Sequence, residues 1–225
     1  MFYLFLLAHL VADFVFQPYW LVERKRYWHG LALHCGIVLA CMLGLGLLDR
    51  AALQLWPAML AITAIHFGAD WWKVNHGHRI PGPPIVPFLL DQVIHVATIA
   101  AVLPLALPSS QVWGLAGSPA SMVAIYVSAY IVALLATPIA VMVWLDPKAE
   151  KQPLAGWARI RSLLAGAAVV SLALYAGAIA LPATLLGLAV VVRRPLSAHP
   201  LDSTEGMLVV IGVAAMLGML LQVAL

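Results

Sequence analysis

Apolar runs long enough to cross a lipid bilayer recur along almost the whole chain. A membrane-spanning helix needs about 20 predominantly apolar residues, and the loops between these runs are too short to hold a soluble domain. The 225 residues are 64% hydrophobic and 9% charged, whereas soluble domains carry roughly a quarter charged residues. The sequence therefore predicts an all-α fold and a single integral-membrane domain over residues 1–225.

We expect a polytopic bundle of transmembrane helices with about seven to eight membrane elements. The predicted elements cover residues 2–22, 30–48, 54–74, 85–107, 119–145, 160–181, 183–194 and 206–224. The first is a retained helix, because no basic segment precedes it and no cleavage site follows it. The apolar stretch 162–192 is too long for one span and too short for two. We expect a short hairpin that turns near Pro182, and one long kinked helix is the alternative.

The basic residues indicate how the chain is oriented. All lysines and arginines except Arg50 fall on alternate loops between the predicted spans. Such loops face the cytoplasm, so both termini are predicted to lie outside a bacterial inner membrane. The hairpin reading keeps Arg193 and Arg194 on the cytoplasmic side. This placement accounts for the net charge of +3, so no nucleic-acid partner is expected. The expected partners are membrane lipids. A homo-oligomer is also possible.

Three of the predicted helices carry a histidine and an aspartate one helical turn apart. The pairs are His9 with Asp13, His66 with Asp70, and Asp91 with His95. A spacing of four residues places both side chains on one face of a helix. The third pair is reversed in sequence and lies on a helix that runs the other way. Each Asp should therefore lie nearer the cytoplasm, in a layer about 6 Å from the histidines. Asp13 is expected to lie deeper in its span than the other two aspartates.

Ionisable groups inside a membrane are costly and usually mark a functional site. Histidine and aspartate are ligands that suit zinc, manganese or iron, so a divalent transition metal is the expected cofactor. The metal-ligand candidates are His9, Asp13, His66, Asp70, Asp91 and His95. The catalytic candidates are Asp13, Asp70, Asp91 and His34, the last as a further ligand or a proton shuttle. Lys73, Gln17 and Gln92 are candidates for contact with a substrate.

The same residues are also compatible with roles that need no catalytic metal. They could relay protons or bind a cation in a transporter or channel, or they could form hydrogen bonds between helices without further chemistry. The run Arg24-Lys25-Arg26 is interpreted as a topology signal, with contact to anionic lipid head groups as the functional alternative.

A weak internal repeat links the first four spans. At an offset of 57 residues, His9 and Asp13 fall on His66 and Asp70, and His34 falls on Asp91. The repeat would make these spans two copies of one helical hairpin in parallel orientation.

Several motifs resemble a bacterial integral-membrane family known only as domain of unknown function 3307. They are HL-x-x-DF-x-x-Q from His9 to Gln17, H-x-x-x-D from His66 to Asp70, Lys73, and F-x-x-DQ-x-x-H from Phe88 to His95. The resemblance covers residues 1–100 strongly, and residues 108–225 are expected to be supporting helices with degenerate motifs. The family's Ile-Gly-x-Leu-Glu-Arg segment is similar to WARIRSLL, which keeps Arg161 and has Ile160 in place of Glu. Basic, acidic and glycine positions of the family fall on Arg193, Arg194, Glu205 and Gly212.

The pattern is also loosely similar to small membrane proteins described as metal-dependent hydrolases. Taken together, the sequence favours a metal-dependent membrane hydrolase. Its expected substrate is a lipid or polyprenyl compound, including a phosphate ester, bound at the cytoplasmic half of the bilayer. A proton- or ion-coupled transporter is the first alternative, and a membrane scaffold or complex subunit without enzymatic activity is the second.

Overall fold

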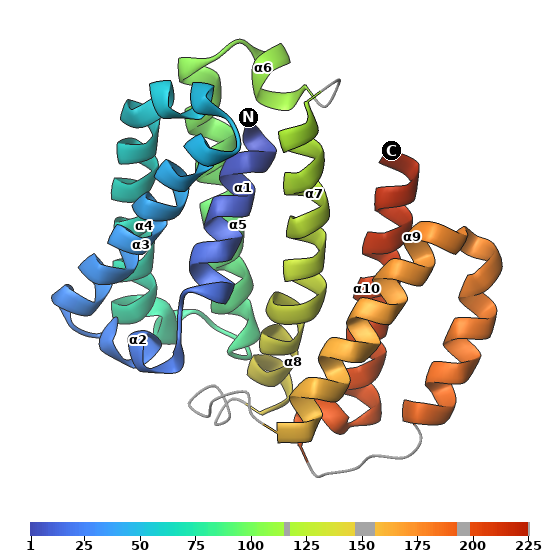
Figure 1. Ribbon diagram of the computed structural model, residues 1–225. Coiled ribbons are helices and arrows are strands. Elements are labelled where there is room, and N and C mark those ends of the chain that lie inside the picture. The colour runs from blue at the N-terminus through green and yellow to red at the C-terminus, as the bar shows by residue number, and fades with distance from the viewer. Residues whose placement is uncertain (115–117, 147–155, 193–198, 225) are drawn as a thin grey trace. The chain divides into compact units, whose positions relative to one another are not determined.

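The computed structural model describes residues 1–114, 118–146, 156–192 and 199–224, and it confirms the predicted all-α fold. Within these residues, six helical segments are long and apolar enough to cross a membrane (Figure 1). They are Trp28–Leu47, Arg50–Arg79, Ile85–Ala106, Pro119–Leu145, Gly156–Gly177 and Thr204–Val223. These bounds agree closely with the predicted spans, because each apolar run ends close to a Pro, Gly or charged residue.

The chain divides into two compact units, Met1–Ser128 and Ala129–Leu225. The helices of the first unit are α1 (Phe2–Leu10), α2 (Tyr19–Arg24), α3 (Trp28–Gly44), α4 (Trp56–His76), α5 (Ile85–Ala106) and α6 (Ser109–Trp113). Helix α7 (Pro119–Ile131) crosses the boundary, and the second unit holds α8 (Thr137–Leu145), α9 (Gly156–Val192) and α10 (Thr204–Ala224). The polar residues of the candidate site lie in the first unit.

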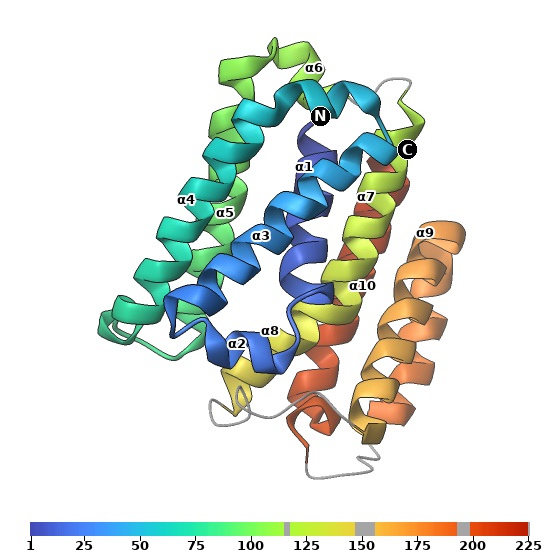
Figure 2. The same cartoon turned by 60° about the vertical axis from the view of Figure 1, so that its left-hand side comes forward.

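Four helices of the first unit form a ring. Helices α1 and α4 each pack against both α3 and α5 (Figure 2). The offset of 57 residues relates α1 to α4 and α3 to α5, so the helices related by the repeat occupy alternate places in the ring. Two parallel copies of one hairpin would produce this arrangement. It directs the repeat's polar positions towards a common centre.

The first predicted span is shorter than the sequence indicated. Helix α1 continues as a π-helical turn over Val11–Val15 and ends there, and Pro18 precedes the next helix, α2. A proline cannot continue the hydrogen-bond ladder of the preceding helix. Asp13 consequently lies in the last turn of the first helix. The expectation that Asp13 is deeper than the other aspartates rested on an unbroken span over 2–22, and the break removes its basis.

Helix α9 contains the predicted hairpin, but its turn is at Gly177 and not at Pro182. Gly177 has φ 60° and ψ −158°, a conformation that is essentially restricted to glycine. The chain reverses there (Figure 1). Pro182 lies near the start of the second helical segment, where its missing amide hydrogen is tolerated. The glycine, rather than the proline, is therefore the residue that permits the turn.

A buried ion pair fixes the start of α9. The guanidinium of Arg161 donates to the carboxylate of Asp202 over 3.0 Å, and the Asp202 side chain is 1% exposed. Asp202 belongs to a short 3₁₀ turn, Pro200–Asp202, just before α10. Arg161 thus joins two elements of the second unit, while Ile160 beside it is exposed. Arg193 and Arg194, which the topology argument used, lie outside the described residues.

Replacing Gly177 with Ala should destabilise the second unit. The new Cβ would lie 2.6 Å from the Gln222 amide nitrogen. In addition, the backbone conformation at this position costs a residue other than glycine about 1–3 kcal/mol. The measurement is thermal unfolding of the purified protein in detergent. Gly212→Ala is the matched control, because a Cβ there meets no atom within 4 Å. Equal melting temperatures for the two variants would contradict the assigned turn.

Candidate functional site

The three His/Asp pairs meet at the centre of the four-helix ring together with His34. Helix α1 and its π-helical turn contribute His9 and Asp13, α3 contributes His34, α4 contributes His66 and Asp70, and α5 contributes Asp91 and His95. Each of the seven side chains belongs to a residue that is at most 7% exposed. The seven residues are spread over four helices, so only the packing of these helices brings their side chains together.

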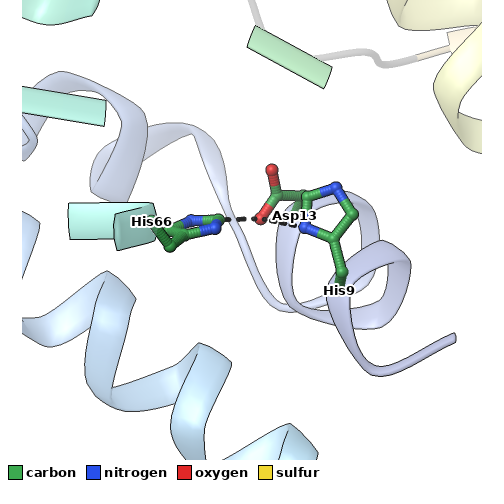
Figure 3. Close-up of side chains that lie close together, drawn as sticks. All are labelled: His9, Asp13 and His66. Carbon is green, nitrogen blue, oxygen red and sulfur yellow. Dashed lines mark ion pairs between the residues drawn. The ribbon is translucent and has the colours of Figure 1, made fainter. Parts of the chain in front are cut away.

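Asp13 lies among the imidazoles. Its Oδ1 is 3.8 Å from His9 Nδ1, 3.8 Å from His66 Nε2 and 3.3 Å from His34 Nε2. Figure 3 shows the carboxylate between the rings of His9 and His66. A π-helical turn holds Asp13, and such turns often occur at functional sites. Among the described residues, Asp13 has no lysine or arginine partner within ion-pair distance.

Four donor atoms from three segments form a compact set around His34, which is fully buried. His34 Nε2 lies 3.0 Å from His66 Nε2 and 3.5 Å from Asp70 Oδ2. His66 Nε2 lies 3.6 Å from Asp70 Oδ2. His34, His66 and Asp70 offer donor atoms within 4.8 Å of one another, and Asp13 Oδ1 lies 3.3 Å and 3.8 Å from the two imidazole nitrogens. We call His34, His66, Asp13 and Asp70 the four-donor set.

A second group of donors lies beside this set. His95 Nε2 is 3.3 Å from Asp91 Oδ1 and 3.6 Å from Asp70 Oδ1. The rings of His66 and His95 stack with centroids 3.9 Å apart. Neither ring nitrogen of His9 or His95 has a hydrogen-bond partner in the described part of the chain. The nearest charged groups to these nitrogens are carboxylates, because His95 Nε2 faces Asp91 and Asp70, and His9 Nδ1 lies 3.8 Å from Asp13.

Two lysines neutralise two of the three aspartates. Lys25 Nζ donates to Asp70 Oδ2 over 2.8 Å, and Lys73 Nζ donates to Asp91 Oδ2 over 2.9 Å. Lys25 is 9% exposed and lies at the end of α2. The sequence did not single it out, because its place in a basic run indicated a topology signal, with contact to anionic lipid head groups as the alternative. Gly30 allows the start of α3 to pack closely against the end of α2, because a Cβ there would collide with the backbone of Arg24.

The three substrate-contact candidates have different environments. Lys73 remains about a third exposed although it binds Asp91. The Gln92 amide donates to Asp13 Oδ2 at 3.5 Å and to Asp91 Oδ2 at 3.3 Å, so it links two aspartates of the cluster. Gln17 lies in the break between α1 and α2, and its buried amide oxygen has no hydrogen-bond partner among the described residues.

A small pocket lies beside the histidines, and neither Lys25 nor Lys73 belongs to its lining in the described chain. His9, His66 and His95 line it together with apolar side chains, among them Phe5, Ile62 and Ile99. No aspartate belongs to its lining in the described chain. The cluster therefore has an apolar approach on its histidine side and a charged side at Lys25 and Lys73.

Removing the charge of Lys25 should destabilise the protein strongly. Lys25→Met leaves Asp70 buried without its cation, and breaking a buried ion pair costs about 3–5 kcal/mol. Thermal unfolding in detergent measures the effect, with Arg26→Met as the exposed neighbouring control. The double variant Lys25→Met/Asp70→Asn should recover part of the loss. A Lys25→Met protein as stable as Arg26→Met would refute the pairing.

Comparison with known proteins identifies the N-terminal part of this chain. Neither the search of curated proteins nor that of solved structures gave a match. A family model described as "Protein of unknown function (DUF3307)" matches residues 1–124, which include every member of the His/Asp cluster and more than half of the sequence. The chain is therefore a member of the DUF3307 family.

Proposed function

We propose that this protein is a metal-dependent membrane hydrolase and that the four-donor set binds zinc or a similar divalent ion. The observation that carries the proposal is the spacing of the four donor atoms. Five separations among them, all except that between the two carboxylates, lie between 3.0 Å and 3.8 Å. A tetrahedral zinc ion with ligands at about 2.0–2.1 Å requires donors roughly 3.3–3.4 Å apart.

The charges of the cluster support a bound cation. Lys25 and Lys73 balance two aspartates, while Asp13 contacts only imidazoles and the Gln92 amide in the described residues. An unbalanced carboxylate inside a membrane protein is strongly unfavourable. A divalent ion next to Asp13 removes this cost. The same ion would also be bound by the lone pairs on Nε2 of His34 and Nε2 of His66, which face each other.

The proposed reaction is hydrolysis of an ester. An ion held by the four-donor set would acidify a bound water and so supply a nucleophile at neutral pH. Attack of the water oxygen on the phosphorus or acyl carbon would break the bond from that atom to the leaving alkoxide, and the alkoxide would take the proton from water. His9 is placed to carry this proton, since it lines the pocket and lies 3.8 Å from Asp13.

The pocket favours an amphiphilic substrate. In the orientation inferred from the basic loops, both termini face outside a bacterial inner membrane, and the aspartates and lysines lie towards the cytoplasm. The small pocket beside the histidines is lined by apolar side chains as well, among them Ile62 and Ile99. A lipid or polyprenyl ester of the cytoplasmic leaflet fits this polarity, with its head group near Lys73 and the start of its chain beside Ile62 and Ile99.

Proton- or ion-coupled transport is the second candidate. It is supported by the unbroken series of close contacts from His95 through Asp70 and His34 to Asp13. Such a series could pass protons without any metal. Flux through proteoliposomes, together with the metal analysis below, separates the two candidates.

Metal analysis tests the proposal directly. Protein purified without chelator should contain at least one equivalent of a transition metal by mass spectrometry. His34→Gln should lower the affinity for the metal by more than about 10–100-fold. That range is found when a group that only hydrogen-bonds to a metal ligand is replaced. His34→Cys should retain metal, because thiolate is a zinc ligand.

His78→Ala serves as the control, since His78 is exposed and lies outside the cluster. Wild-type protein without metal, even after incubation with zinc, would remove the hydrolase from consideration. Full metal affinity in His34→Gln would show that the ion binds elsewhere.

A change in the pocket should separate substrate binding from metal binding. Ile99→Phe narrows the pocket above the histidines and should raise KM for a long-chain phosphate ester by about 10-fold or more. The metal content and the turnover of a short water-soluble ester should stay the same. Ile65→Phe, at an exposed position on α4, is the control. Equal losses for both substrates would contradict an acyl or prenyl site in this pocket.

A further inference from the structure

The cluster contains more donor atoms than one tetrahedral ion can use. His95 Nε2, Asp91 Oδ1 and Asp70 Oδ1 all lie outside the four-donor set. They form the group described above, in which His95 is 3.3 Å from Asp91 and 3.6 Å from Asp70. Asp13 also reaches this group, because Asp13, Asp91 and His95 offer donor atoms within 4.8 Å of one another.

The two oxygens of Asp70 face different histidines. Its Oδ2 faces His34 and His66, whereas its Oδ1 faces His95. A carboxylate with this arrangement can bridge two metal ions about 3.5–4 Å apart, the separation found in two-metal phosphatases and nucleases. The stacked rings of His66 and His95 provide one imidazole ligand on each side of the bridge.

We propose that the cluster is a dinuclear metal site in which the carboxylate of Asp70 bridges a first ion in the four-donor set and a second ion held by Asp91 and His95. This inference rests on the proposed metal site and adds a second ion to it. His95 is 2% exposed, and its Nε2 is directed at the carboxylates of Asp91 and Asp70.

The lysines are compatible with two ions. Lys73 binds Oδ2 of Asp91 and leaves Oδ1 towards His95. Lys25 binds Oδ2 of Asp70, and a carboxylate oxygen has a second lone pair for an ion. Two dications more than balance three carboxylates, and the two lysines add further positive charge. The loaded site would attract an anion, so the inference favours a phosphate ester over a carboxylic ester as the substrate class.

Metal counting and magnetic coupling test the second ion without reference to activity. Metal-depleted protein is reconstituted with Mn²⁺, its metal content is measured, and its electron paramagnetic resonance spectrum is recorded. The inference expects two equivalents and a spectrum of two exchange-coupled ions in the wild type. His95→Gln and Asp91→Asn should each retain one equivalent with the signal of an isolated ion.

His78→Ala should keep both equivalents and the coupled spectrum. One equivalent in the wild type, or two ions without coupling, would overturn the dinuclear site while leaving the mononuclear hydrolase intact. No bound metal in the wild type would overturn both proposals. Should His95→Gln or Asp91→Asn fail to fold, the wild-type spectrum alone decides the question.

Discussion

The burial of three aspartates among membrane-spanning helices is the constraint on which the rest of the first unit depends. Each carboxylate must be balanced or it would exclude the helices from the bilayer. Lys25 balances Asp70 and Lys73 balances Asp91. Asp13 is surrounded by imidazoles instead. The helix ring is therefore organised around its charges, and the apolar contacts between helices position these charges.

The break in the first helix serves the same requirement. Helix α1 and its π-helical turn end at Val15, and the short α2 brings Lys25 back against Asp70. An unbroken first span would carry Lys25 away from the cluster, since a helix advances about 1.5 Å with each residue. The proline at position 18 and the π-helical turn thus have a common effect: they place Asp13 and Lys25 at a similar depth along the helix ring.

The two sides of the cluster differ in polarity. Histidines and apolar side chains face the pocket, whereas the aspartates contact the lysines. In the proposed function, the imidazoles face an apolar chain on one side and the lysines face a head group on the other. The second unit, with its hairpin at Gly177 and its Arg161–Asp202 pair, contributes none of the cluster residues.

The sequence by itself determined the class of fold, the limits of most spans and the pairing of each His with an Asp, because these depend on local hydrophobicity and on residues one helical turn apart sharing a face. It also singled out Gln92 and His34. Only the tertiary structure decided that His34 faces both Asp13 and Asp70 and that Lys25 turns inwards. It also decided that one oxygen of Asp70 faces His34 and His66 while the other faces His95. Those relations join helices far apart in the chain. They depend on how the helices rotate and pack, which no local pattern encodes.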